Sequence, residues 1–301
     1  MNALSSELDQ TAINNSYNAL SEAYDEGLVS PAVLIANSTF ESWIEHQLLQ
    51  EDDIVSRYGG SESPEDAYWE DCLEASSTAL DTHSSRVEYA NENNLIDREE
   101  YQILEGFRQV RNQIANEQEW YASEPLNEEG ILNDSGVETG LDDGIRLWER
   151  LMGVSENSIL AQGRGEWEQE YLSQTEGNLV ENMAAVAEQT YSTDEPALNP
   201  VAGIIAYNSL LDQVPERVEQ ETELSFNSYL LQPGMQDENE RPIPEMSEVL
   251  PSSPRETPYD FLSSLENMRM LFAHNVESFS LMPNSRADEI IDYGIDLTRQ
   301  L

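Results

Sequence analysis

The chain has 301 residues, enough for one large domain or two smaller ones. It carries 60 acidic residues against 14 basic ones, every basic residue is an arginine, and the formal net charge is −46. This much like charge disfavours a compact chain at ordinary ionic strength, but at 1 M salt the Debye length falls to about 3 Å and screens most of the repulsion. We therefore expect a surface adapted to molar salt, as in the cytoplasm of salt-accumulating archaea. The alternative is an acidic decoy or partner of a basic protein.

Composition also excludes several classes of protein. A hydrophobic fraction of 39% with five Trp and thirteen Tyr favours a packed core over disorder. The single cysteine, Cys72, rules out an intrachain disulfide or a cysteine-based zinc site, and the three histidines have no metal-binding spacing. The N-terminal sequence MNALSSELDQ lacks the features of a signal peptide, and no apolar run approaches the roughly 20 residues that cross a membrane. We expect a cytoplasmic protein without a membrane segment, a metal or a cofactor.

The first half of the chain predicts a series of amphipathic helices. Apolar residues recur every three to five positions between Leu4 and Tyr24, as on one face of a helix. Ser30-Pro31 indicates a helix start with proline in the first turn, and helix starts are also expected at Ser63-Pro64 and at Asp97. A further helix covers 141–151. Because strand-like alternation is nearly absent, the predicted fold class is all-α, built as one or two helical bundles.

The second half is also predicted to be helical, with a long interruption. The sequence DEPALNP at 194–200 ends a polar helical stretch, and a new helix is expected from Val201. Residues 233–258 contain six prolines and predict a long loop. Two helices, over about 259–275 and 285–301, are expected at the end of the sequence. The predicted organisation is a bundle over 1–153, a helical connector over 154–199 and a second helical region over 200–301.

Three segments of the second half match three segments of the first half in the same order. The alignment places Arg111 on Arg269, Asn116 on His274 and Gly144 on Gly294. The order of the matches favours a duplicated helical unit, whereas chance similarity between amphipathic helices is the alternative. The matching pairs are 31–38 with 200–209, allowing two inserted residues, 104–116 with 262–274, and 141–151 with 291–301.

The segment FRQVRNQIANEQEW, at Phe107–Trp120, contains a short polar motif. Arg111 and Asn112 are adjacent, and Asn116 follows five positions after the arginine. Together with the apolar helix AVLIANSTFESWIEHQL and the closing helix of the first half, this segment resembles the HEPN superfamily of small helical-bundle proteins. Members of that superfamily typically carry an Arg, a polar residue, and a His four to six positions after the Arg, near a helix end.

The resemblance extends from Ser30 to about Leu151. The first half matches the arginine and the polar position but departs from the pattern at Asn116, where the superfamily has its histidine. In the second half Arg269 and His274 match the arginine and the histidine, and a methionine occupies the polar position. The resemblance implies dimers whose motifs face each other across a shared cleft. A duplicated chain would build that cleft from four candidate site residues, Arg111, Asn112, Arg269 and His274.

These residue types fit cleavage of RNA without a metal. The reaction needs a group that accepts or donates a proton, which a His does near neutral pH, and a cation that stabilises charge on the phosphate, which an Arg does with two donors. Each residue also has a structural interpretation. Arg111 would pair with a neighbouring carboxylate such as Glu99, Glu100 or Glu117, Asn116 would cap a helix, and His274 would favour the negative pole of a helix. His46 and His83 are interpreted as non-catalytic.

Three functions remain open at the level of sequence. The first is RNA binding or metal-independent endoribonuclease activity, with single-stranded RNA as the partner. The second is a non-catalytic scaffold that uses the same bundle to form a homodimer or to bind a protein partner. The third is a viral or assembly component with no role in RNA chemistry.

Overall fold

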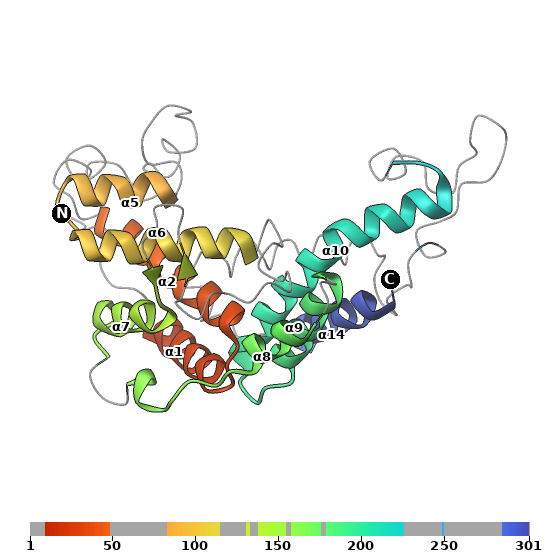
Figure 1. Ribbon diagram of the computed structural model, residues 1–301, viewed down its shortest axis with the longest axis horizontal. Helices are drawn as coiled ribbons and strands as arrows, with labels where there is room; N and C mark the ends of the chain where they lie inside the picture. Colours follow the sequence, from red (N-terminus) through yellow and green to blue (C-terminus); the bar gives the residue numbers. More distant parts are fainter. Residues whose placement is uncertain are drawn as a thin grey trace.

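The computed structural model describes residues 10–48, 83–114, 131–132, 138–154, 158–175, 179–225, 249 and 285–300. Within these ranges the regular structure is helical apart from one antiparallel pair of two-residue strands, which confirms the all-α prediction (Figure 1). The helices are α1 (Gln10–Asp25), α2 (Val29–Leu48), α5 (His83–Glu92), α6 (Arg98–Asn112), α7 (Leu141–Leu151), α8 (Trp167–Gln174), α9 (Leu179–Tyr191), α10 (Asn199–Thr222) and α14 (Ser285–Gln300), with the 3-10 helices η3 (Ile159–Ala161) and η4 (Pro196–Leu198), and the strands are β1 (Ile131–Leu132) and β2 (Glu138–Thr139).

The first group of helices is built around α2. This helix is buried along most of its length because α1, α5, α6 and α7 all pack against it. Helices α5 and α6 lie side by side as a hairpin, with α1 and α7 elsewhere around α2 (Figure 1). The first turn of α2 is held by a residue outside this group, Glu168 of α8. The buried carboxylate of Glu168 accepts hydrogen bonds from the backbone nitrogen of Ser30, at 2.8 Å, and from the Ser30 hydroxyl.

Several helix starts expected from the sequence are confirmed. Helix α2 begins beside Ser30-Pro31, and α7 has the expected bounds. Asp97 caps α6 through a reciprocal pair of hydrogen bonds: its carboxylate accepts from the Glu100 backbone at 2.9 Å, and the Glu100 carboxylate accepts from the Asp97 backbone at 2.7 Å. The start expected at Ser63-Pro64 lies outside the described residues.

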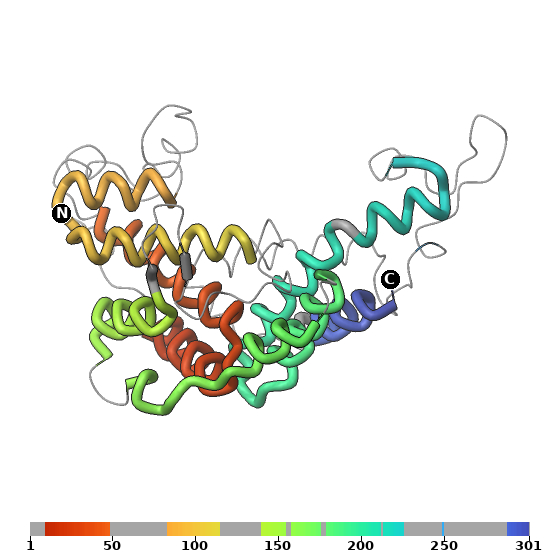
Figure 2. Tube along the Cα trace, in the orientation of Figure 1, coloured from red at the N-terminus to blue at the C-terminus, as the bar shows by residue number. Residues whose placement is uncertain are grey.

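The second group consists of α9, α10 and α14, which pack mainly on one another. Figure 2 shows the blue α14 beside the cyan α10, although the two are far apart in the sequence. The helix expected over 285–301 is confirmed as α14, and the helix expected from Val201 is confirmed as α10, which contains Pro215. The helix expected over 259–275 lies outside the described residues, as does the loop expected over 233–258 except for Val249.

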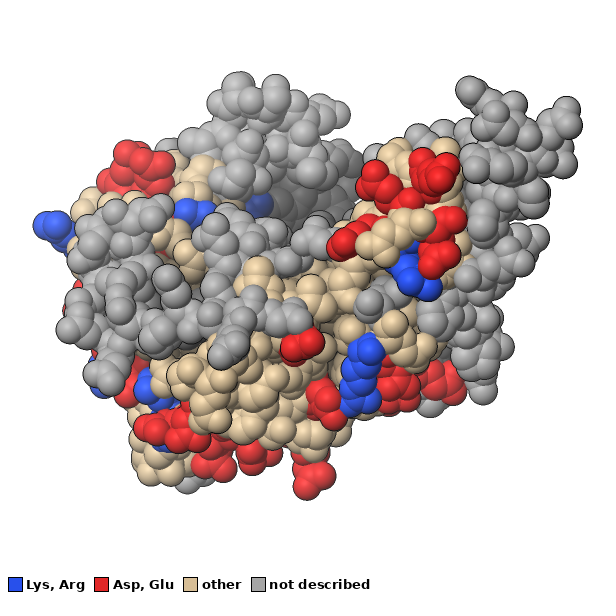
Figure 3. Space-filling view, turned by 45° about the vertical axis from the view of Figure 1, so that its right-hand side comes forward, with Lys and Arg blue, Asp and Glu red and all other residues tan. Residues whose placement is uncertain are grey.

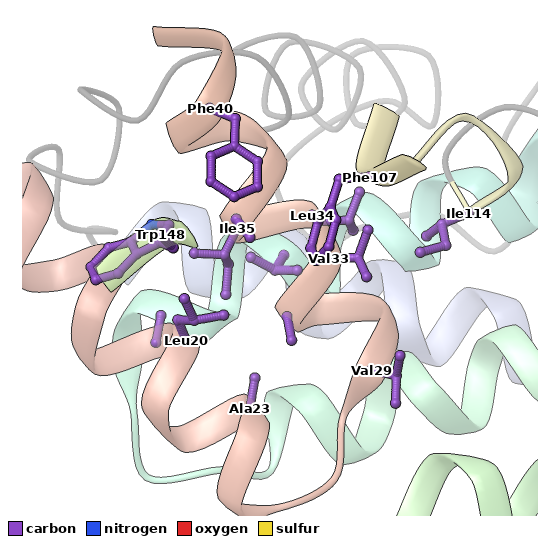
Figure 4. Close-up of a cluster of buried hydrophobic side chains, with 14 of the residues drawn as sticks. Leu20, Ala23, Val29, Val33, Leu34, Ile35, Phe40, Phe107, Ile114 and Trp148 are labelled. Atoms are coloured by element: carbon purple, nitrogen blue, oxygen red, sulfur yellow. The ribbon is translucent and has the colours of Figure 1, made fainter. Parts of the chain in front are cut away.

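One connected core joins the two groups. Its centre lies where α2 meets α6 and α7, and Figure 4 shows Leu34, Ile35, Phe107 and Trp148 among its side chains. The rings of Phe40 and Phe107 pack edge to face with their centroids 5.5 Å apart. The same cluster continues through η4 and the first half of α10 to α14, the contributors there being Ala197, Leu198, Val201, Ala202, Ile204, Ile205, Ala206, Ile291 and Ile295.

The burial of α14 follows that of α7. Across 141–150 and 291–300 the aligned residues share the same degree of burial except at Glu149, which is buried, and Arg299, which is exposed. Gly144 and Gly294 are buried in both. Helix α7 packs on α2 and helix α14 packs on α10, and α2 and α10 each have a proline in the first turn. This agreement is what a duplicated unit requires, although the domain boundaries and the duplication remain predictions.

Candidate functional site

The structure describes two of the four site residues predicted from the sequence. Arg111 and Asn112 form the last turn of α6. Arg269 and His274 lie outside the described residues, as does Asn116. The convergence of the two halves on one cleft therefore remains a prediction, and the geometry that follows belongs to the first half.

Arg111 points into the bundle, with only 8% of its side chain exposed. Its Nη2 lies 3.9 Å from Oε1 of Glu41 on α2, and its Nη1 donates to Oδ1 of Asn112 at 2.8 Å. Glu41 is itself 4% exposed and accepts a 3.0 Å hydrogen bond from the Asn37 side chain. The carboxylate facing Arg111 therefore comes from another helix, and Glu100, a sequence neighbour, pairs with Arg150 instead.

Polar side chains of three helices meet around Glu41. A spacing of four residues puts Asn37, Glu41 and Glu45 on one face of α2. Glu45 pairs with Arg86 of α5, and the guanidinium of Arg108 forms two hydrogen bonds with Glu105 within α6, at 2.5 and 2.9 Å. We call this group the polar cluster: Asn37, Glu41 and Glu45 of α2, His83 and Arg86 of α5, and Glu105, Arg108, Arg111 and Asn112 of α6.

The polar cluster differs from the rest of the chain in its charge. It holds three carboxylates and three guanidinium groups, whereas the whole chain has 60 acidic residues against 14 basic ones. Removing charges from water costs several kcal/mol per ion unless each is paired and hydrogen-bonded. In this cluster Glu41 and Arg111 are buried and the other charged side chains are half-buried, so most of the pairs keep some contact with water.

His83 belongs to the polar cluster, and sequence reasoning missed it. His83 is the first residue of α5, and both nitrogens of its imidazole are buried without a hydrogen-bond partner in the described part of the chain. Burial lowers the pKa of His83 to about 4; Glu41 acts in the opposite direction, and Arg86, Arg111 and Arg108 lower it further. The imidazole is therefore neutral at pH 7. No spacing in the sequence links it to Arg111, because the packing of α5 on α6 brings them together.

Within the described ranges, no three His, Cys, Asp or Glu side chains are arranged to hold a metal ion. Among the described helices, none combines the length and the apolar character needed to cross a bilayer. In comparisons with known proteins, no family model, no curated protein and no solved structure matches the chain.

Proposed function

We propose that the chain is a HEPN-like protein that binds single-stranded RNA and cleaves it without a metal ion. One observation supports this most: of the two residues that match the motif, Arg111 is buried and Asn112 is half-buried, and both lie in a cluster of balanced charge. A buried guanidinium is preorganised, because little side-chain freedom remains to be lost when it binds a phosphate.

Each residue of the pair has a role in this proposal. Arg111 would bind the phosphate, because a guanidinium offers two donors to phosphate oxygens and stabilises the charge that gathers there during cleavage. The 3.9 Å between Nη2 of Arg111 and Oε1 of Glu41 is longer than a direct charge-assisted hydrogen bond. Asn112 accepts a hydrogen bond from Arg111 and fixes its orientation.

The experiment compares cleavage by the wild type, Arg111→Lys and Arg146→Lys, in molar KCl with EDTA. Lysine keeps the charge at position 111 but loses the planar pair of donors, so we expect kcat/KM to fall by about 100-fold or more. Arg146→Lys is the matched control, since Arg146 is exposed, lies outside the polar cluster and pairs with Asp143 on its own helix. If the wild type leaves every RNA intact, both with EDTA and with added divalent metal, the proposal is wrong.

The second candidate is a non-catalytic scaffold that forms a homodimer or binds a protein partner. The burial of Arg111 favours it, because buried charge pairs can serve to fix which helices meet. In that case Arg111→Lys would change the oligomeric state or the melting temperature. Neither the wild type nor any variant would cleave RNA. Light scattering coupled to gel filtration in molar KCl measures the oligomeric state.

A further inference from the structure

The geometry points to His83 as the proton-transferring residue of the Arg111 site, in place of the histidine that the motif lacks at Asn116. This inference rests on the proposed function and names a residue that the motif does not contain. His83 lies on α5, whereas the motif lies on α6. The inference concerns the first half of the chain alone.

The first argument is the state of the imidazole. A neutral imidazole has one donor and one acceptor, and neither ring nitrogen of His83 has a hydrogen-bond partner among the described residues. Leaving a buried polar group without a partner costs about 1–3 kcal/mol, and such groups are rare in folded proteins. Oδ1 of Asn37, beside Glu41, is a second buried atom of the polar cluster without a partner. The ring nitrogens of His83 and Oδ1 of Asn37 therefore leave donor and acceptor positions in the polar cluster to which a bound ribose or phosphate would hydrogen-bond.

The second argument is the set of charges around the ring. Glu41 faces it from α2, Arg86 from its own helix, and Glu105, Arg108 and Arg111 from α6. Three cations and burial keep the ring neutral, so it starts in the form that accepts a proton. A phosphate bound at Arg111 would offset the cations and add negative charge, which raises the pKa of His83 toward the working pH.

The chemistry balances with this one residue. His83 takes the proton from the 2′-hydroxyl of a ribose, the 2′-oxygen forms a bond to phosphorus, and the bond from phosphorus to the 5′-oxygen breaks. The imidazolium then gives its proton to the departing 5′-oxygen. The products are a 2′,3′-cyclic phosphate and a 5′-hydroxyl end, and the imidazole returns to its neutral form. Arg111 stabilises the charge on the phosphate throughout.

The test compares His83→Gln with His46→Gln and His274→Ala. We expect His83→Gln to lower kcat by about 100-fold or more, as for loss of a general base or acid, with the Kd for a 2′-O-methyl RNA within twofold of the wild type. His46→Gln is the matched control, because His46 is in the last turn of α2 and outside the polar cluster. If wild type and His83→Gln cleave equally well while His274→Ala is inactive, the inference is overturned and the proposed function survives.

A second measurement does not depend on the variant's folding. NMR of the wild type labelled at the histidine rings gives the pKa of His83 with and without the 2′-O-methyl RNA, which binds but cannot react. We expect the pKa to rise by one unit or more on binding. A pKa that does not move while RNA binds overturns the inference, since a merely structural imidazole would not respond. A wild type that neither binds nor cleaves RNA overturns the proposed function together with it.

Discussion

Phe107 and Gly144 meet where α6 packs on α7, and the contact has no space for another atom. A Cβ placed on Gly144 would lie 1.9 Å from the tip of the Phe107 ring. Gly144→Ala should therefore lower the free energy of unfolding by about 1–3 kcal/mol, even after the gain in helix propensity that alanine brings. Denaturant titration in molar KCl measures it.

Gly140→Ala serves as the control for this steric prediction. Gly140 precedes α7, and its nearest non-neighbouring atom would be 3.6 Å from an added Cβ, which is an ordinary contact. We expect a loss well below that of Gly144→Ala. Equal stability of Gly144→Ala and the wild type would show that α6 and α7 are not packed as described.

The neutral state of His83 makes stability depend on pH. Its pKa is lowered from an ordinary value of about 6.5 to about 4 by burial. Above pH 6.5 the ring is neutral in both the folded and the unfolded chain, so burying it has no protonation cost and stability is highest with respect to His83. As the pH falls toward 4, the unfolded chain binds a proton that the folded chain does not, so stability is lost by up to about 1.4 kcal/mol per pH unit.

The comparison of the wild type with His83→Gln isolates this effect, because the carboxylates titrate similarly in both proteins. As the pH falls from 6.5 to 4, the unfolding free energy of the wild type should fall relative to that of His83→Gln, and below pH 4 the difference should level off. A difference that is constant over this range would mean that His83 is accessible to water and protonates freely in the folded protein.

Between elements, the pair Glu41–Arg111 joins α2 to α6. Glu41→Gln removes the carboxylate charge that faces the buried guanidinium of Arg111, and we expect it to lower stability by about 3–5 kcal/mol. Adding Arg111→Met removes the second charge and should recover most of that loss. As a control, breaking the exposed pair of Asp143 and Arg146 with Arg146→Met should change stability by less than about 1 kcal/mol. Loss of the same size in both pairs would contradict the burial of Glu41 and Arg111.

The helices could be predicted from the sequence where local chemistry defines them. Asp97 and Glu100 form a capping box within four residues, and the apolar spacing of α6 and α7 is that of a helix. The polar cluster was not predictable in the same way. Glu41 and His83 reach Arg111 only through the packing of three helices, whereas reasoning along the chain offered Glu99, Glu100 or Glu117 as its partner, and Glu117 lies outside the described residues. Helical periodicity identifies the buried face of each helix but does not identify which face of which other helix packs against it.

The duplication predicts whether Gly294→Ala, in α14, raises or lowers the stability of the protein. A glycine in an ordinary helix interior is unfavourable, so Gly294→Ala would raise stability by about 1 kcal/mol. If α14 repeats α7, Gly294 instead marks a close helix contact like that of Gly144 with Phe107, and Gly294→Ala would lower stability. Gly294 is buried and shares the burial pattern of Gly144. Denaturant titration of the two variants side by side tests the repeat.

At the scale of the whole molecule, charge and core are separated. The apolar cluster runs continuously from α1 to α14, whereas most carboxylates of the described residues lie outside it. Figure 3 shows Asp and Glu gathered over the outer half of α10, where Glu216, Glu219, Glu221 and Glu223 are all exposed. In the described part of that surface, Arg217 reduces the repulsion between these carboxylates through a 3.0 Å ion pair with Glu221.

This separation predicts a fold that depends on salt. With 60 acidic residues and no lysine, lowering KCl from about 1 M to 0.1 M lengthens the Debye length from about 3 to 10 Å, so the repulsion between exposed carboxylates grows and the melting temperature should fall. Replacing Glu216, Glu219 and Glu223 together by Gln removes three exposed charges from α10 without touching the core, and should make the fall smaller. Thermal melts over this range of KCl, with sucrose of equal osmolality as a control for excluded solute, measure both effects. A melting temperature independent of KCl would contradict adaptation to molar salt and would favour the acidic surface as a binding face for a basic protein.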